Sequence, residues 1–283
     1  MDIITGLSPE QLFAGSLPQE EQPTPPTVPD APPASAPPVM ENPPSTMLTL
    51  PRGLRHERAW HTDVVIRELT GMDEETLGRF TNFLDRWEVL IALGIESIGP
   101  VTFSDKPLAE RREMSMRLLS GERMMIFLAV VGATFGDKRT YTFTCRQCQT
   151  EMESDILVSQ DFPVSTPEDG YGTHTYAFTT RKGDKIEYRL PTGADERDVL
   201  DRKNLNEGER NTQLLTAIVQ KINGKPPLDP EAYLRNMPIQ DRIGLLTAVN
   251  KYQPTYDFSM DIECVKCGHP NHFEIEPLEL FRF

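Results

Sequence analysis

The chain has 283 residues, of which 38% are hydrophobic and 25% charged, and its formal net charge is −14 at pH 7. This composition is typical of a soluble globular protein with one or two domains. The acidic balance argues against a protein that binds phosphate backbones, because nucleic-acid-binding proteins usually carry a basic face. The longest apolar run, Met124–Ala133, is too short to cross a bilayer, and no cationic segment followed by an apolar one indicates export. We therefore expect a cytoplasmic protein without a membrane or nucleic-acid partner.

Residues 1–17 are predicted to form a short docking peptide. Ser8 can cap a short helix that has Pro9 in its first turn. The alternative is a frayed terminus whose apolar residues have no role. The predicted partner-binding side chains are Leu7, Leu12 and Phe13.

Residues 18–47 are predicted to be a disordered, proline-rich linker. Eleven prolines lie between Pro18 and Pro44, and almost no bulky side chain separates them. Such a segment buries too little apolar surface to offset its ordering entropy, and it favours an extended, semi-rigid chain.

The rest of the chain contains the same pattern twice. With a shift of 119 positions and no gap, residues 121–162 align with residues 240–281, so that Cys145 meets Cys264 and Cys148 meets Cys267. Upstream, the segment that begins at Leu69 resembles the one that begins at Pro191. This self-similarity predicts two tandem repeats, residues 48–166 and residues 167–283.

Each repeat is predicted to hold a strand, several helices and a final hairpin. The strands "VVIREL" and "KIEYRL" precede Thr-Gly turns, after which acidic residues favour a helix start. In the first repeat, Phe80, Phe83, Leu84, Trp87, Leu90 and Ile91 follow helical spacing and are expected in the core. A second helix begins near Ser120 or Ile239, and alternating strands then flank each cysteine pair.

Two arginines recur at matched positions near these helix starts. Arg123 follows Glu122 and Arg242 follows Asp241. We expect a repeated structural salt bridge at these places and consider an anion site the weaker alternative.

All four cysteines occur in two C-x-x-C pairs, which in a reducing compartment are more often metal ligands than disulfides. Two such turns, one from each repeat, can share one tetrahedral zinc ion, with a closed site that is structural and not catalytic. The shared ion would close a loop from Gln149 to Glu263 and lock the two repeats together. The predicted ligands of this one zinc per chain are Cys145, Cys148, Cys264 and Cys267.

Two alternatives compete with the shared zinc site. His269 and His272 follow the second cysteine pair closely, but Thr150 and Glu153 stand at their counterparts in the first repeat. A redox C-x-x-C needs an accessible thiolate at a helix N-terminus, whereas both pairs here follow predicted strands.

Motifs for other chemistry are missing from the sequence. It has no Walker loop, no G-x-G-x-x-G and no G-x-S-x-G. We therefore predict a protein that is not an enzyme and has no small-molecule substrate.

The pattern "IRELTGMDEETL", followed by a buried helix, by "TCRQCQTEMESDILVSQDF" and by a second C-x-x-C, resembles the T-even-type phage baseplate family. That family includes hub assembly chaperones, with relatives in phage tails and contractile injection systems. The resemblance covers about residues 48–283, and the first cysteine turn departs from the usual pattern because it lacks Pro and Gly. It implies a non-catalytic role in building or forming a baseplate, with hub, spike or wedge proteins as partners. The protein would act in the cytoplasm during assembly or stay in the finished particle.

The predicted fold class is α+β, with two tandem pseudo-symmetric repeats that share one zinc-ribbon-like site behind a disordered N-terminal tail. The alternative function is a zinc-ribbon adaptor of a transcription or other nucleoprotein complex, which a basic face would favour. An oxidoreductase is the third class, and a thiol of low pKa would distinguish it.

Overall fold

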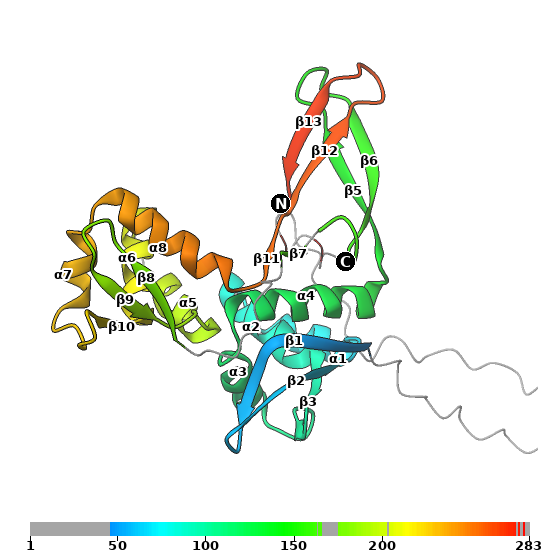
Figure 1. Ribbon diagram of the computed structural model, residues 1–283. Coiled ribbons are helices and arrows are strands. Elements are labelled where there is room, and N and C mark those ends of the chain that lie inside the picture. The colour runs from blue at the N-terminus through cyan, green and yellow to red at the C-terminus, as the bar shows by residue number, and fades with distance from the viewer. Residues whose placement is uncertain are drawn as a thin grey trace, which may run out of the picture. The chain divides into compact units, whose positions relative to one another are not determined.

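The computed structural model describes residues 46–162, 164–165, 175–202, 204–275, 277 and 280 (Figure 1). The chain divides into two units, residues 1–41 and residues 42–283, and every described residue belongs to the second. The predicted docking peptide with Leu7, Leu12 and Phe13 therefore lies outside the described residues and stays a prediction. Thr46 and Met47, the last two residues of the predicted linker, begin the first strand.

The first half of the described chain builds a four-stranded antiparallel sheet, four helices and a hairpin. The sheet has the order β1-β2-β3-β4, and β5 pairs with β6. The elements are β1 (Thr46–His56), β2 (Ala59–Ile66), α1 (Gly71–Leu77), α2 (Phe83–Gly94), β3 (Ile95–Ile98), β4 (Val101–Thr102), α3 (Leu108–Ser115), α4 (Ser120–Phe135), β5 (Lys138–Thr144) and β6 (Glu151–Leu157).

The second half contains a three-stranded antiparallel sheet of the order β10-β9-β8, four helices and a second hairpin, β12-β13. A short pair, β7 with β11, joins segments from the two halves. The elements are β7 (Val164–Ser165), β8 (Tyr176–Thr179), β9 (Lys185–Tyr188), α5 (Gly193–Leu200), α6 (Glu207–Ile218), β10 (Val219–Ile222), α7 (Pro230–Arg235), α8 (Ile239–Lys251), β11 (Thr255–Tyr256), β12 (Ser259–Glu263) and β13 (Pro270–Glu274).

The described residues thus form a mixed α+β fold with eight helices and several small sheets, which confirms the predicted fold class at this level. The order of elements in the two halves is similar. In each half, an antiparallel strand pair precedes two helices, a third strand follows the second helix, and two more helices lead into a hairpin. None of the helices in the described part of the chain is long and apolar enough to span a membrane.

The first helix of each half begins with the same polar contacts. Asp73 accepts hydrogen bonds from the backbone N–H and the hydroxyl of Thr70, at 2.8 and 2.9 Å, and forms an ion pair with Arg67 at 2.8 Å. Burial alone would raise the pKa of Asp73, but the bonds from Arg67 and Thr70 outweigh it and hold the pKa below its ordinary value. At α5, the same contacts join Arg189, Thr192 and Asp195. The acidic residues predicted at these helix starts therefore cap the first turn of each helix.

The larger of two hydrophobic cores lies between the β1–β4 sheet, α2, α4 and the paired hairpins, and the smaller lies among β9, β10 and helices α6 to α8 (Figure 1). The apolar run Met124–Ala133 is part of α4, whose Ile126, Phe127 and Val130 are fully buried. A Cβ at Gly94 would lie 2.2 Å from a methyl carbon of Val130, so only glycine permits the close approach of α2 and α4.

The apolar stripe predicted for α2 is only partly in the core. Leu90 and Ile91 are buried as expected, but Phe80 precedes the helix and Phe83 is 50% exposed. The last seven residues of α2, from Glu88 to Gly94, are all buried, because neighbouring elements surround this half of the helix on every side. The helical spacing therefore identified the element, but it did not show which turn of the helix is covered.

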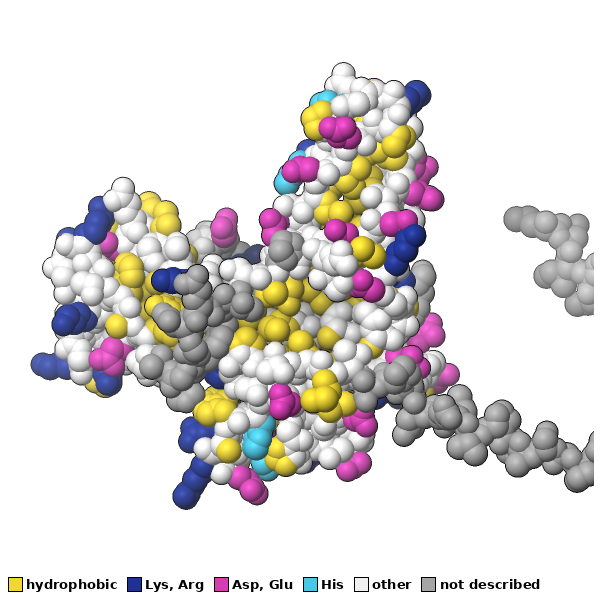
Figure 2. Space-filling model, turned by 45° about the vertical axis from the view of Figure 1, so that its right-hand side comes forward, with side chains coloured by type: hydrophobic (Ala, Val, Ile, Leu, Met, Phe, Trp, Pro, Cys, Tyr) yellow, Lys and Arg dark blue, Asp and Glu magenta, His cyan; other side chains and the backbone are white. Residues whose placement is uncertain are grey.

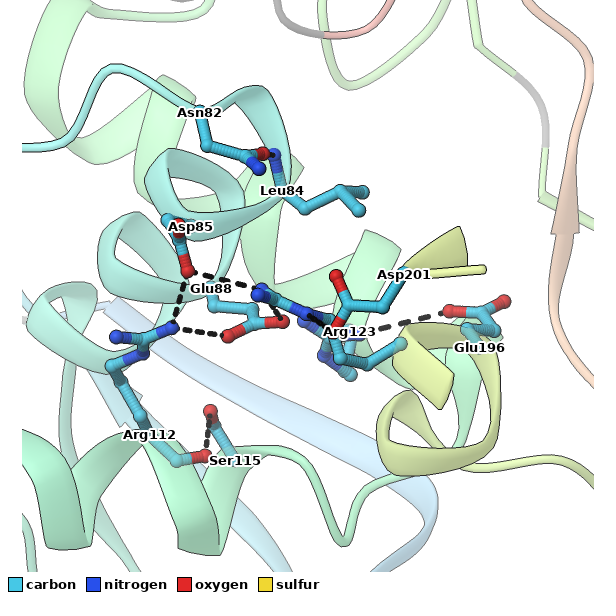
Figure 3. A network of polar contacts seen from close by, with 10 residues as sticks. Asn82, Leu84, Asp85, Glu88, Arg112, Ser115, Arg123, Glu196 and Asp201 are labelled. Atoms are coloured by element: carbon cyan, nitrogen blue, oxygen red, sulfur yellow. Dashed lines mark hydrogen bonds and ion pairs between the residues drawn. The ribbon is translucent and has the colours of Figure 1, made fainter. Parts of the chain in front are cut away.

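Four charged side chains connect α2, α3 and α5 (Figure 3). Glu88, whose side chain is only 7% exposed, binds Arg112 at 2.6 Å and Arg197 at 2.8 Å through its two carboxylate oxygens. Asp85 contacts the same two guanidinium groups at 2.9 and 3.1 Å. Each arginine is thus shared between two acids of α2, and the cluster joins a helix of the first half to a helix of the second.

Replacement of Glu88 by Gln is expected to lower the free energy of unfolding by about 2–3 kcal/mol, because it leaves two partly buried guanidinium groups with one carboxylate. The matched control is Asp85→Asn, whose more exposed side chain should cost less than about 1 kcal/mol. Urea unfolding at constant metal content measures both. Equal losses in the two variants would show that Glu88 is not the centre of the cluster.

Candidate metal centre

Each cysteine pair lies in the turn of a hairpin with the same backbone hydrogen bonds. In the first turn, Cys145 N–H donates to Thr150 O at 2.9 Å and Gln149 N–H donates to Cys145 O at 2.9 Å. In the second turn, Cys264 N–H bonds His269 O at 2.9 Å and Gly268 N–H bonds Cys264 O at 2.8 Å. We call each of these turns a knuckle.

The left-handed position of the first knuckle is occupied by a residue with a side chain. Gln149 has a φ of 56°, whereas the second knuckle has Gly268 at the matched position with a φ of 68°. Gln149 offsets part of the strain with a side-chain hydrogen bond to Arg146 O at 3.2 Å. The departure of "CRQCQ" from the usual pattern therefore does not change the turn.

The structure brings the four predicted cysteines together. Their sulfur atoms all lie within 4.8 Å of one another. Two of the contacts join one hairpin to the other: Cys145 Sγ to Cys267 Sγ at 3.8 Å, and Cys148 Sγ to Cys264 Sγ at 3.6 Å. Four thiolates that bind one zinc ion tetrahedrally at about 2.3 Å are separated by about 3.8 Å, so the residues present fit this ion.

The hairpins that carry the knuckles pack against each other along their inner faces (Figure 1). The rings of Phe143 and Phe273 are 4.5 Å apart between centroids, and Met152 and Ile156 are buried in the same hydrophobic core. Figure 2 shows a band of hydrophobic side chains along the paired hairpins, with acidic side chains at its margins. The apolar contact between the hairpins fixes their approach below the knuckles.

The cysteines differ in exposure and in their hydrogen bonds. Cys145 and Cys264, the first residue of each pair, are buried, whereas Cys148 is half-buried and Cys267 is exposed. The Thr150 hydroxyl lies 3.2 Å from Cys148 Sγ, and its hydrogen bond lowers the pKa of that thiol to about 6. The cysteines are free and not joined in a disulfide. Four free thiols this close together are the donors from which a thiolate metal site is built.

The structure separates the competing ligands from this cluster. His272 lies on the outer face of β13, where its Nδ1 contacts Asp261 at 2.9 Å and its side chain is 62% exposed. His269 contributes its backbone oxygen to the turn. The group of described residues that could hold a metal ion consists of the four cysteines alone. Both cysteine pairs directly follow strands, β5 and β12. A redox pair favours the N-terminus of a helix, and neither pair lies at one.

Sequence reasoning missed Asn271, which is 1% exposed and lies directly beside the cluster. Its Oδ1 accepts the N–H of Arg146 at 2.9 Å, and its Nδ2 donates to His269 O at 2.9 Å and faces Cys145 Sγ at 3.7 Å. The alignment of the chain with itself did contain a signal, because the residue aligned with Asn271 is the apolar Met152. A polar residue at a position where the other hairpin has an apolar one indicates a role that is specific to the second hairpin.

These features define an α+β protein in which two hairpins build a candidate metal centre from four cysteines. Residues 103–281 match the family model described as T4 bacteriophage base plate protein, and because the match spans more than half of the chain, the chain belongs to this family. The family expected from the sequence is thus confirmed. Neither the comparison with curated proteins nor the comparison with solved structures gave a match.

Proposed function

We propose that the chain is a non-catalytic, zinc-stabilised component that acts in the assembly or architecture of the phage baseplate. A baseplate-related structural role follows from membership of the family. The zinc and the assembly role are our inference. The observation that carries it is the convergence of two knuckles, distant in sequence, on one cluster of four sulfur atoms.

Zinc is the metal that best suits this set of donors. Soft thiolates in a tetrahedral arrangement favour zinc or an iron–sulfur cluster over the harder cations. Cys145, Cys148, Cys264 and Cys267 would hold one ion per chain, and four protein ligands leave no open position for a substrate or water. The ion would then supply stability and no catalysis, in agreement with the predicted non-enzymatic role.

We infer that the two halves arose as two copies of one unit. The ungapped alignment at 119 positions, the shared order of elements and the matched contacts at α1 and α5 support this interpretation. Both knuckles also have the same backbone hydrogen bonds. The zinc would lie between the two copies, each copy contributing one half of its ligands.

We further propose that the chain meets hub, spike or wedge proteins in the cytoplasm during assembly, as a chaperone or as a lasting part of the particle. Residues 1–17 would dock on such a partner through Leu7, Leu12 and Phe13, and residues 18–45 would act as a tether. The lack of basic residues in residues 1–51 suits a basic receptor surface.

Co-expression of the full chain with the hub, spike and wedge proteins of the same phage tests this role. We expect the chain to copurify with at least one of them, and deletion of residues 1–17 to lower the recovery at least about tenfold while the zinc content stays the same. Gln11→Ala with Ser16→Ala is the matched control and should keep the recovery. Recovery of RNA polymerase in place of baseplate proteins would support the alternative function as a transcription adaptor. Unchanged recovery after the deletion would show that residues 1–17 are not a docking peptide.

A further inference from the structure

Asn271 touches both knuckles, although its side chain belongs to the second hairpin only. The backbone N–H of Arg146, inside the first knuckle, donates to Oδ1 at 2.9 Å. Nδ2 donates to the backbone oxygen of His269, at the end of the second knuckle, at 2.9 Å. It also lies 3.7 Å from Cys145 Sγ, a sulfur of the first knuckle. One amide thus connects three points around the cluster of sulfur atoms.

The orientation of this amide follows from its partners. A backbone N–H can only donate, so the atom that faces Arg146 N must be the amide oxygen. The NH2 group then points toward His269 O and Cys145 Sγ, both of which accept. A buried amide is unfavourable unless it is hydrogen-bonded, and here both ends have partners.

Packing alone gives no reason for an asparagine at this place. Met152 stands at the same position of the first hairpin, second in the returning strand, and is buried among apolar neighbours. An apolar side chain therefore fits this position in the other copy. The asymmetry between Met152 and Asn271 points to a task that only one of the two hairpins performs.

We propose that Asn271 is a positioning residue of the metal centre. It holds the first knuckle against the second, so that the four sulfur atoms are assembled before an ion binds. Its N–H group, with Nδ2 3.7 Å from Cys145 Sγ, would hold that sulfur in place for the ion, as groups behind metal ligands generally do. This role rests on the proposed zinc centre and identifies the residue that orients its first ligand.

The test uses the full chain with Asn271→Asp and Asn271→Leu. The aspartate has the same shape but cannot donate to Cys145 Sγ or His269 O, and the leucine resembles the methionine of the other hairpin. We expect zinc affinity, measured by competition with a chromophoric chelator, to fall about 10–100-fold in both variants. The thiolate-to-cobalt charge-transfer band of the cobalt-loaded protein should shift, because the environment of Cys145 changes.

Met152→Ala is the matched control, since it removes buried volume at the same place of the other hairpin. It should lower the thermal midpoint but leave zinc affinity within about threefold and the cobalt spectrum unchanged, because no ligand is reoriented. Circular dichroism verifies that each variant is folded. Wild-type affinity and spectrum in both Asn271 variants would overturn the positioning role. Failure of the wild-type chain to bind zinc or cobalt would overturn the metal centre itself.

Discussion

Removal of the metal from the purified protein is expected to lower its stability by about 4–5 kcal/mol, by analogy with a cross-link that closes a long loop. The four thiolates would join knuckles that are separated by residues 149–263, and the linked chain loses much of its unfolded-state entropy. For a domain of this size, the thermal midpoint should fall by roughly 10–15 °C. Calorimetry before and after treatment with a strong chelator under reducing conditions measures the change.

Acidification should have the same effect as chelation. Zinc binds thiolates, so protons compete with it for the sulfur atoms and metal affinity falls as the pH falls. Metal analysis after dialysis at decreasing pH should find one zinc per chain at neutral pH and progressively less in acid. Two ions per chain, or no ion under reducing conditions at neutral pH, would contradict the four-cysteine centre.

Loss of one ligand should loosen both hairpins, because the ion would belong to both. In Cys145→Ser, amide hydrogen exchange is expected to increase in β12 and β13 as well as in β5 and β6. Val265→Ser, an 88% exposed position beside Cys264, is the control and should leave exchange unchanged. Full protection of β12–β13 in Cys145→Ser would show that the second hairpin does not depend on a shared ion.

The meeting of the four cysteines could be predicted from the sequence because the alignment of the chain with itself has no gap around them. A constant shift of 119 positions places Cys145 on Cys264 and Cys148 on Cys267, and two equal turns with two ligands each can complete one tetrahedron. Strand alternation located the hairpins, and the acidic turns after Thr70 and Thr192 located two helix starts. These features are local, so short windows of sequence contain them.

Features that depend on distant contacts could not be predicted in this way. Asn271 has its role because Arg146, 125 residues away, donates to it. The charge cluster around Glu88 likewise needs Arg197 from the other half of the chain. Helical spacing also placed Phe83 in the core, whereas the structure leaves it half exposed. Periodicity identifies the apolar face of a helix, but it does not show along how much of the helix other elements cover that face.

The repeated salt bridge expected beside Arg123 and Arg242 is replaced by longer-range contacts. Arg123 is buried, and its Nη1 lies 3.6 Å from Glu196 of α5. Asp241 forms its ion pair with Arg181 at 3.1 Å. Glu122, at the start of α4, accepts hydrogen bonds from backbone groups. Adjacent charges on one helix point in different directions, so they seldom pair with each other.

Glu122 binds the start of α4 to an irregular part of β1. Its Oε1 accepts the N–H groups of Arg52 at 2.5 Å and Gly53 at 2.7 Å, and its Oε2 accepts the N–H of Leu119 at 3.1 Å. The register of β1 with β2 shifts between Thr49 and Leu54, so the N–H groups within this interval need another acceptor. The residue is fully buried, so in the native structure these N–H groups depend on its carboxylate and not on solvent.

Replacement of Glu122 by Ala is therefore expected to lower the free energy of unfolding by about 3–5 kcal/mol, because three N–H groups lose their acceptor and a cavity forms. Glu122→Gln keeps one oxygen in place and should cost about 1–3 kcal/mol.

The matched control is Asp241→Ala, at the same place in the second half. Asp241 accepts the N–H of Arg181 at 3.0 Å, and the Arg181 side chain is 58% exposed, so we expect the free energy of unfolding to fall by about 1–2 kcal/mol. Urea unfolding of the zinc-loaded protein measures all three variants. A loss in Glu122→Ala no larger than that in Asp241→Ala would show that water or a shifted β1 satisfies these N–H groups, and that Glu122 does not hold the strand to the helix.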